Sequence, residues 1–171
     1  MYQPQQAPQT QKLAQVPDGV GGIAATLSYM QAFVKEGKID PTVRGKAIEL
    51  IQDLPPKEYK LEMEAIFDYV QNAVRYVRDI SDVETVQSPV VTLDLLAGDC
   101  DDKATLLAAM LESIGFKTRF KAVGFTYNTI GHVYVENRLG TIWIPLDATE
   151  PYPAGWAPPA SAVKASITRH N

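Results

Sequence analysis

Three residues of this chain have the types, and the order along the chain, of a cysteine nucleophile, its base and the group that orients the base. They are Cys100, His132 and Asp147. A thiolate attacks carbonyl carbon, an imidazole takes up and returns the proton, and a carboxylate holds the imidazole in one tautomer. Cys100 is the single cysteine of the chain, so it cannot form a disulfide within it. We take these three residues as the candidate catalytic site.

Cys100 stands directly before a stretch that predicts a buried helix. From 101 to 114 the apolar residues fall on most sides of a helix, as in a helix enclosed by protein. The N-terminus of a helix favours a thiolate through its partial positive charge, and its free N–H groups suit an oxyanion. The carboxylates of Asp99, Asp101 and Asp102 oppose this, because nearby negative charge raises the pKa of a thiol.

Hydrophobic periodicity predicts the elements that must position these residues. Apolar residues at helical spacing predict three further helices, at 23–37, 41–54 and 59–77. Residues 79–99 look irregular. After Gly115 the period changes to two, which predicts three strands at 117–125, 130–137 and 140–147. Helices followed by adjacent strands indicate an α+β fold, with a helical N-terminal half packed on a small antiparallel sheet.

The register of the last two strands decides whether Asp147 can reach His132. A turn over residues 137–140 places His132 opposite Pro145 and makes Asp147 its diagonal neighbour on the same face, about 7–8 Å away at Cα. The same register pairs two aliphatic couples on the other face, Val133 with Ile144 and Val135 with Ile142. A shift by one residue loses that match. We therefore expect Asp147 to orient His132.

Composition limits the possible functions. Apolar residues make up 46% of the 171 residues and charged residues 21%, which is typical of a soluble globular protein. The net charge of −4 argues against binding nucleic acid, which requires a basic surface. No apolar run reaches the ~18 residues of a membrane span, and the polar N-terminus does not resemble a secretory signal. These features predict a soluble protein without a nucleic-acid or membrane partner.

Each candidate residue has an ordinary structural explanation when it is taken alone. A cysteine beside apolar helix residues is more often a buried core thiol, a histidine on a strand is usually a surface or core residue, and Asp147 could begin a turn at Asp-Ala-Thr. The combination of Cys100 at a helix start, His132 on a strand and a correctly phased Asp147 favours the catalytic interpretation. His170 lies in a polar terminal segment and is not included.

Several motifs together resemble the bacterial and phage branch of the transglutaminase-like superfamily over residues 57–150. These motifs are Tyr-Val-Arg-Asp at 76–79, Ser-Pro at 88–89, Leu-Ala-Gly-Asp-Cys-Asp-Asp at 96–102, Leu-Glu-Ser-Ile-Gly-Phe at 111–116, Gly-His-Val-Tyr-Val-Glu at 131–136 and Trp-Ile-Pro-Leu-Asp-Ala-Thr at 143–149. The resemblance implies a papain-related fold in which Cys100 is the nucleophile, His132 the base and Asp147 the orienting acid. It also implies the chemistry of an amide hydrolase or acyltransferase that works through a thioester.

Composition and the resemblance together suggest how the chain is organised, and the resemblance suggests where it acts. We expect a flexible Gln/Pro-rich tail at 1–18, a helical pair at 19–56, the transglutaminase-like domain at 57–150 and a Pro-rich tail without regular elements at 151–171. Small proteins of this type occur in phage and prophage genomes. The expected substrate is a protein or peptide, met in the host cytoplasm or on a virion. The alternative function is a structural or assembly component of a phage particle that uses the fold as a binding module.

The sequence also offers candidates for an oxyanion donor and for a wall of the site. Asn72 is the candidate donor to an oxyanion, with Gln71 and Gln87 as other upstream amides, and Trp143 could wall the site or pack in the core. No cofactor is expected. The acidic run around Cys100 lacks the glycine and the final glutamate of an EF-hand loop, so it predicts no metal site. Calcium loops like those of the animal enzymes have no room in this chain.

Overall fold

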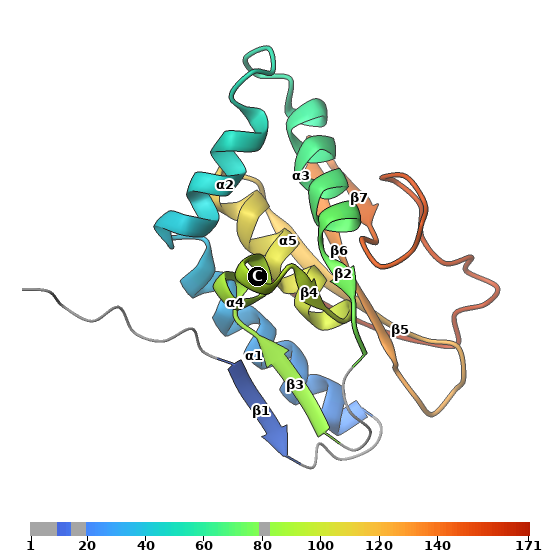
Figure 1. Cartoon of the computed structure of the whole chain (residues 1–171). Helices are drawn as coiled ribbons and strands as arrows, with labels where there is room; N and C mark the ends of the chain where they lie inside the picture. Colours follow the sequence, from blue (N-terminus) through green and yellow to red (C-terminus); the bar gives the residue numbers. More distant parts are fainter. Residues whose placement is uncertain (1–9, 15–19, 79–82) are drawn as a thin grey trace, which may run out of the picture.

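A computed structural model of the chain describes residues 10–14, 20–78 and 83–171, and Figure 1 shows their arrangement. Residues 1–9 and 15–18 of the expected N-terminal tail lie outside the described residues. None of the helices in the described part is long and apolar enough to cross a membrane. The helices are α1 (Val20–Gly37), α2 (Pro41–Ile51), α3 (Tyr59–Ala73), α4 (Pro89–Leu95) and α5 (Cys100–Ser113).

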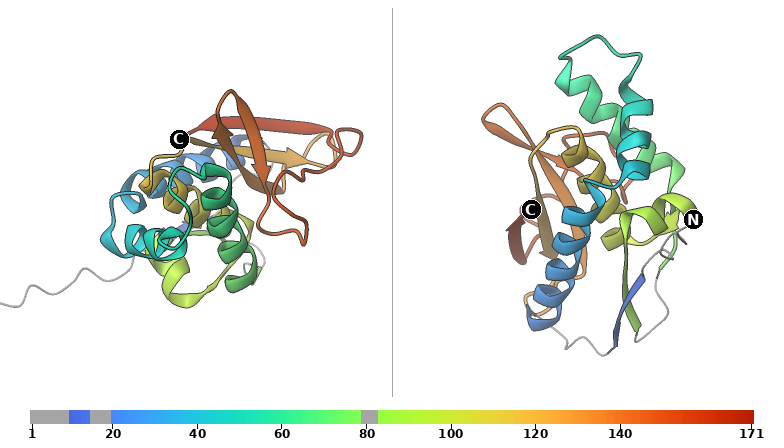
Figure 2. Two further views of the ribbon diagram at one scale, coloured as in Figure 1. Left: turned by 90° about the horizontal axis from the view of Figure 1, so that it is seen from above. Right: turned by 90° about the vertical axis from the view of Figure 1, so that its left-hand side faces the viewer.

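Helix α5 is the centre of the fold. It lies between the other four helices and the largest sheet, and Figure 2 shows these helices gathered on one side of that sheet. Because α5 is enclosed on all sides, residues 101–111 are all buried, as their apolar composition predicted. Its partner helices contribute apolar faces such as that of α3, with Met63, Ile66, Phe67 and Val70.

The largest sheet carries the predicted strands. Its order is β7-β6-β5-β8 and all its pairs are antiparallel. The strands are β5 (Thr118–Gly124), β6 (His132–Leu139), β7 (Ile142–Leu146) and β8 (Ala165–His170). The α+β class and the antiparallel sheet were correctly predicted. Strand β8 was not, because residues 151–171 were expected to lack regular elements; beyond the prolines, however, the chain returns to pair with the free edge of β5.

Two small sheets lie where the sequence predicted irregular chain or helix. Strand β1 (Thr10–Ala14), inside the expected tail, pairs antiparallel with β3 (Val83–Gln87). Strand β2 (Arg75–Tyr76) pairs in parallel with β4 (Ala97–Gly98), so α3 stops at Ala73 rather than continuing to residue 77. The chain at Arg75–Tyr76 leaves the helical conformation because its backbone pairs with a segment about twenty residues further along the chain.

The predicted register of the last hairpin is wrong by four residues. Val135 lies opposite Leu146 rather than Ile142, because the two-residue loop is Gly140-Thr141 and β6 continues through Leu139. Gly140 takes φ 61°, which suits a glycine at the first loop position. A shift by an even number leaves every side chain on its predicted face, since the side-chain period is two.

Candidate active site

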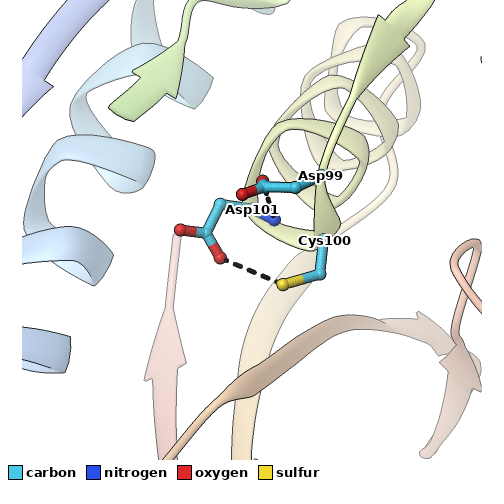
Figure 3. Close-up of side chains that lie close together, drawn as sticks. All are labelled: Asp99, Cys100 and Asp101. Carbon is cyan, nitrogen blue, oxygen red and sulfur yellow. Dashed lines mark hydrogen bonds between the residues drawn. The ribbon is translucent and has the colours of Figure 1, made fainter. Parts of the chain in front are cut away.

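Cys100 is the first residue of α5, as predicted. Asp99 caps the helix by accepting hydrogen bonds from the backbone N–H groups of Asp101 at 3.0 Å and Asp102 at 3.4 Å. The side chain of Asp102 accepts in return from the N–H of Asp99 at 3.2 Å, which completes a capping box. Figure 3 shows the thiol projecting from this capped end toward the carboxylate of Asp101, to which it donates at 3.4 Å.

The surroundings of Cys100 favour the neutral thiol. Burial raises its pKa well above the ordinary value, and the negative charges of Asp101 and Asp99 raise it further. A hydrogen bond from the backbone of Val133 acts in the other direction. That bond also places the thiol against β6 at the residue that follows His132. Reaction as a thiolate therefore needs a base that removes the proton during attack.

His132 and Asp147 meet as predicted. His132 begins β6, Asp147 directly follows β7, and the distance between Nε2 and Oδ2 is 2.6 Å. Because a carboxylate only accepts, Nε2 carries the hydrogen of this bond, and Nδ1 is left as the nitrogen that can accept a proton. Asp147 is 3% exposed, and its other oxygen accepts from the N–H of Thr149 at 3.1 Å.

The three candidate residues thus come from one helix start and two strand ends that adjoin each other. The contacts join His132 to Asp147 and join Cys100 to the backbone beside His132. In the described part of the chain, the side-chain hydrogen bond of the thiol goes to Asp101 and not to His132. The arrangement has the parts for thiol addition to a carbonyl group, with an oriented imidazole as the proton carrier.

The predicted upstream amides are engaged elsewhere. Asn72 is exposed and donates to the carbonyl of Asp68 at 2.8 Å, within its own helix. Gln87 donates to the carboxylate of Asp102 from its backbone and from its side chain, both at 2.7 Å. Gln71 donates to two carbonyl groups in the segment after Asp147, those of Glu150 and Tyr152, both at 2.7 Å.

Trp143 takes neither of its predicted roles in full. It shares the sheet face of Asp147, but its ring is covered by the guanidinium of Arg119 at 4.2 Å and by His170 at 5.5 Å. It therefore packs on the outer face of the sheet, near the strand ends remote from Cys100. His170, expected in a polar tail, belongs to β8.

Two residues that the sequence interpretation omitted support the site. Lys103 is 3% exposed, and its ammonium donates to the carbonyl of Val74 at 2.8 Å and that of Gln71 at 3.2 Å. Burial lowers the pKa of Lys103, and the charge of Asp147 partly opposes that effect. Tyr134 is buried beside His132, with ring centroids 6.2 Å apart, and burial raises its pKa to about 12. A lysine in an otherwise apolar helix was the available signal for Lys103.

The acidic residues beside the thiol are too few to form a metal site by themselves. Asp99, Cys100 and Asp101 offer one ligand atom each, and these three atoms lie within 4.8 Å of one another. Calcium takes six to eight oxygen ligands, and magnesium a regular octahedron of oxygens. Two carboxylates and a thiol do not supply such a set, and one of the carboxylates caps α5. The cluster alone is therefore not a preformed site for either ion.

Comparison with known proteins identifies a family for the chain. The family model of the transglutaminase-like superfamily matches residues 48–148, more than half of the chain. No protein with a curated description matches in sequence.

Solved structures share the fold. A candidate protease from Parabacteroides distasonis aligns at TM-score 0.59 and 18% identity, over 75% of this chain and 26% of that protein. A candidate cysteine protease from Cytophaga hutchinsonii aligns at TM-score 0.55 and 18% identity, over 95% of this chain and 58% of that protein. LapG from Legionella pneumophila aligns at TM-score 0.51 and 21% identity, over 72% of this chain and 75% of that protein. The chain thus spans only part of the length of the first two.

Proposed function

The chain belongs to the transglutaminase-like superfamily, and from this premise we propose that it is a cysteine-dependent hydrolase or acyltransferase of amide bonds in proteins or peptides. The observation that carries the proposal is the 2.6 Å contact between His132 and Asp147, at the strand end against which the Cys100 helix begins. A buried carboxylate that orients an imidazole, one residue from the backbone group that contacts the thiol, supports this chemistry.

In the first half of the proposed reaction, Cys100 attacks the carbonyl carbon of the substrate while Nδ1 of His132 takes the thiol proton. The carbonyl oxygen becomes an oxyanion, and the backbone N–H of Cys100 at the start of α5 is the proposed donor to it. Asp147 stabilises the imidazolium through Nε2. The C–N bond then breaks, His132 returns its proton to the leaving amine, and a thioester remains on Cys100.

The second half of the reaction decides between hydrolysis and transfer. If water attacks the thioester, with His132 again accepting a proton, a carboxylic acid and the free thiol result. If an amine attacks, a new amide forms and the same thiol is released. Both outcomes use the same three residues, so we propose the chemistry of the site without assigning its acceptor.

The raised pKa of Cys100 shapes this mechanism. A preformed thiolate–imidazolium pair would need the imidazolium to outweigh burial and two carboxylates. We therefore propose that the thiol is protonated at rest and that its proton moves to His132 as the carbon–sulfur bond forms. Iodoacetamide should consequently react slowly at neutral pH and faster as the pH rises.

The proposal is tested with three variants in two assays. Fluorescent casein reports hydrolysis, and dansylcadaverine incorporation into casein reports transfer. We expect Cys100→Ala to abolish activity and His132→Ala to lower it by at least about a thousandfold, because members of a triad act as a unit. Asp147→Asn should lose less activity and keep the fold, since the amide can still accept from Thr149 but favours the wrong imidazole tautomer.

Asp53→Asn, in the exposed loop after α2, is the matched control and should behave as the parent chain. Both assays are run with calcium and with EGTA, because LapG was solved in calcium-bound and EGTA-treated forms. Equal iodoacetamide profiles across pH for the parent and His132→Ala would show that His132 does not serve the thiol. The alternative of a phage structural component, with a host or virion location, would then be the better proposal.

A further inference from the structure

A groove lies at the end of the molecule remote from Cys100. It consists of a cavity of about 730 Å³ and an adjoining one of about 390 Å³, which share Gly115, Phe116, Lys117 and Arg138. The groove surrounds the C-terminal end of α5, whose 14 residues span about 20 Å from Cys100. It is therefore separate from the proposed active site, and its function does not depend on that proposal.

Positive charge dominates this groove. Lys38, Arg44, Lys117 and Arg138 line it. Glu112 is the one side-chain carboxylate among the lining residues, and it is already occupied by Lys38 at 3.0 Å and by the hydroxyl of Thr118 at 2.8 Å. A chain with a net charge of −4 thus places four basic side chains here beside one side-chain carboxylate.

Three of the cations lack a carboxylate partner within the described residues. Arg44 donates to the carbonyl of Ser113, at the end of α5, and Arg138 donates from Nε to the carbonyl of Gly140 at 3.1 Å. Lys117 is exposed and makes no ion pair in the described part of the chain. Capping of α5 accounts for Arg44, but it leaves Lys117 and Arg138 unexplained.

Apolar side chains alternate with these cations. The rings of Tyr59 and Phe116 meet edge to face at 6.4 Å, and both line the smaller cavity. Ile39, which lines the larger one, is 77% exposed. A groove that mixes cations with exposed apolar surface suits a chain that carries both carboxylates and apolar side chains.

We propose that this groove docks an acidic, extended peptide segment of a partner protein, with Lys117 and Arg138 contacting its carboxylates and Tyr59, Phe116 and Ile39 contacting its apolar side chains. Two joined cavities fit an extended chain better than a single small anion. The acidic net charge of the protein disfavours a nucleic acid as the occupant.

The test uses the full chain and a fluorescein-labelled decapeptide in which glutamate alternates with leucine. Fluorescence anisotropy measures its dissociation constant, and the same peptide with glutamine in place of glutamate is the control ligand. We expect the glutamate peptide to bind at least about tenfold more tightly, and the difference to shrink as salt rises from 50 to 500 mM. Equal affinity for the two peptides, or no binding of the acidic one, would overturn the proposal.

Matched charge reversals locate the site. Lys117→Glu and Arg138→Glu should each weaken binding of the acidic peptide at least about fivefold. Lys164→Glu makes the same change in net charge beside Gly124, at the opposite end of β5, and should change it less than about twofold. Equal effects of all three variants would mean attraction by overall charge and would refute a groove. Competition by a single-stranded oligonucleotide would also overturn the proposal, because it would identify a nucleic acid as the occupant of the groove.

Discussion

At the thiol, two opposite influences act on one proton. Burial and the carboxylates of Asp101 and Asp99 hold the proton on sulfur, whereas the backbone hydrogen bond from Val133 favours its loss. The 3.4 Å contact with Asp101 belongs to the protonated form, because a carboxylate accepts from a thiol but repels a thiolate. Asp101 therefore contributes to keeping Cys100 unreactive until a base removes the proton.

Replacing this carboxylate isolates its effect. We expect Asp101→Asn to lower the pKa of Cys100, because the change removes a negative charge while keeping the shape of the side chain. The measurement is the rate of iodoacetamide alkylation between pH 6 and 10, and the midpoint of the profile should move to lower pH. Asp53→Asn serves again as the control. A midpoint that stayed in place, or rose, would show that the charge of Asp101 does not raise the pKa of Cys100.

At the scale of elements, the start of α5 depends on a close approach of two chain segments. A Cβ added to Gly98 would lie 2.5 Å from the Cβ of Asp102 and 2.7 Å from its Oδ2. Asp102 closes the capping box and accepts two hydrogen bonds from Gln87. Gly98 therefore allows β4 and the first turn of α5 to fit together, and this fit sets the position of Cys100.

Gly98→Ala should accordingly destabilise the protein by about 1–3 kcal/mol, because overpacking commonly has this cost. It should also change the rate of iodoacetamide alkylation of Cys100, because the added Cβ moves the start of α5. The matched control is Gly45→Ala in α2, where an added Cβ meets nothing within 4 Å. That substitution should stabilise the protein by up to about 1 kcal/mol, through helix propensity. Urea denaturation measures the free energy of unfolding of both variants. Similar effects of the two alanines would show that the fit at Gly98 is not limiting.

A chain of polar contacts links three elements around the site. Lys103 in α5 donates to the carbonyl groups at the end of α3, and Gln71 in α3 donates to those of Glu150 and Tyr152. This chain connects the helix that carries Cys100 with the segment that follows Asp147. Through these contacts, Lys103 and Gln71 help to fix the position of Cys100 relative to Asp147 without taking part in the chemistry.

For the whole molecule, the raised pKa values of Cys100 and Tyr134 couple stability to alkaline pH. The Cys100 thiol ionises in the unfolded chain at about pH 8.5 but well above that in the folded protein, so unfolding releases its proton and stability falls as the pH passes that value. We expect the parent chain to lose up to about 1.4 kcal/mol more than Cys100→Ala between pH 7.5 and 9.5.

Urea denaturation at the two pH values measures this loss, and Tyr134→Phe is the control. The pKa of Tyr134 rises from 10.0 to about 12, so its own contribution is lost only above about pH 10, and the phenylalanine variant should match the parent over the lower range. Equal losses in the parent and in Cys100→Ala would show that the thiol titrates alike in both states.

Local pattern determined a large part of this protein. The existence of α1, α2, α3 and α5, the position of Cys100 before a buried helix and the faces of the strands followed from periods of 3.6 and 2, which each segment carries within itself. Helix α4 did not follow, because residues 79–99 were expected to be irregular, and α3 ends at Ala73 rather than at residue 77. The contact of His132 with Asp147 also followed, even though the predicted register was off by four residues, because an even shift preserves the face.

Only the tertiary structure decided which distant segments pair. The return of β8 to the edge of β5, the pairing of β1 with β3 and of β2 with β4, and the link from Lys103 through Gln71 to residue 152 all join positions far apart in the sequence. Asn137 shows the same limit: it looked like a turn residue, yet it is fully buried within β6. Such pairings depend on what each segment meets across the fold, and no local period encodes that.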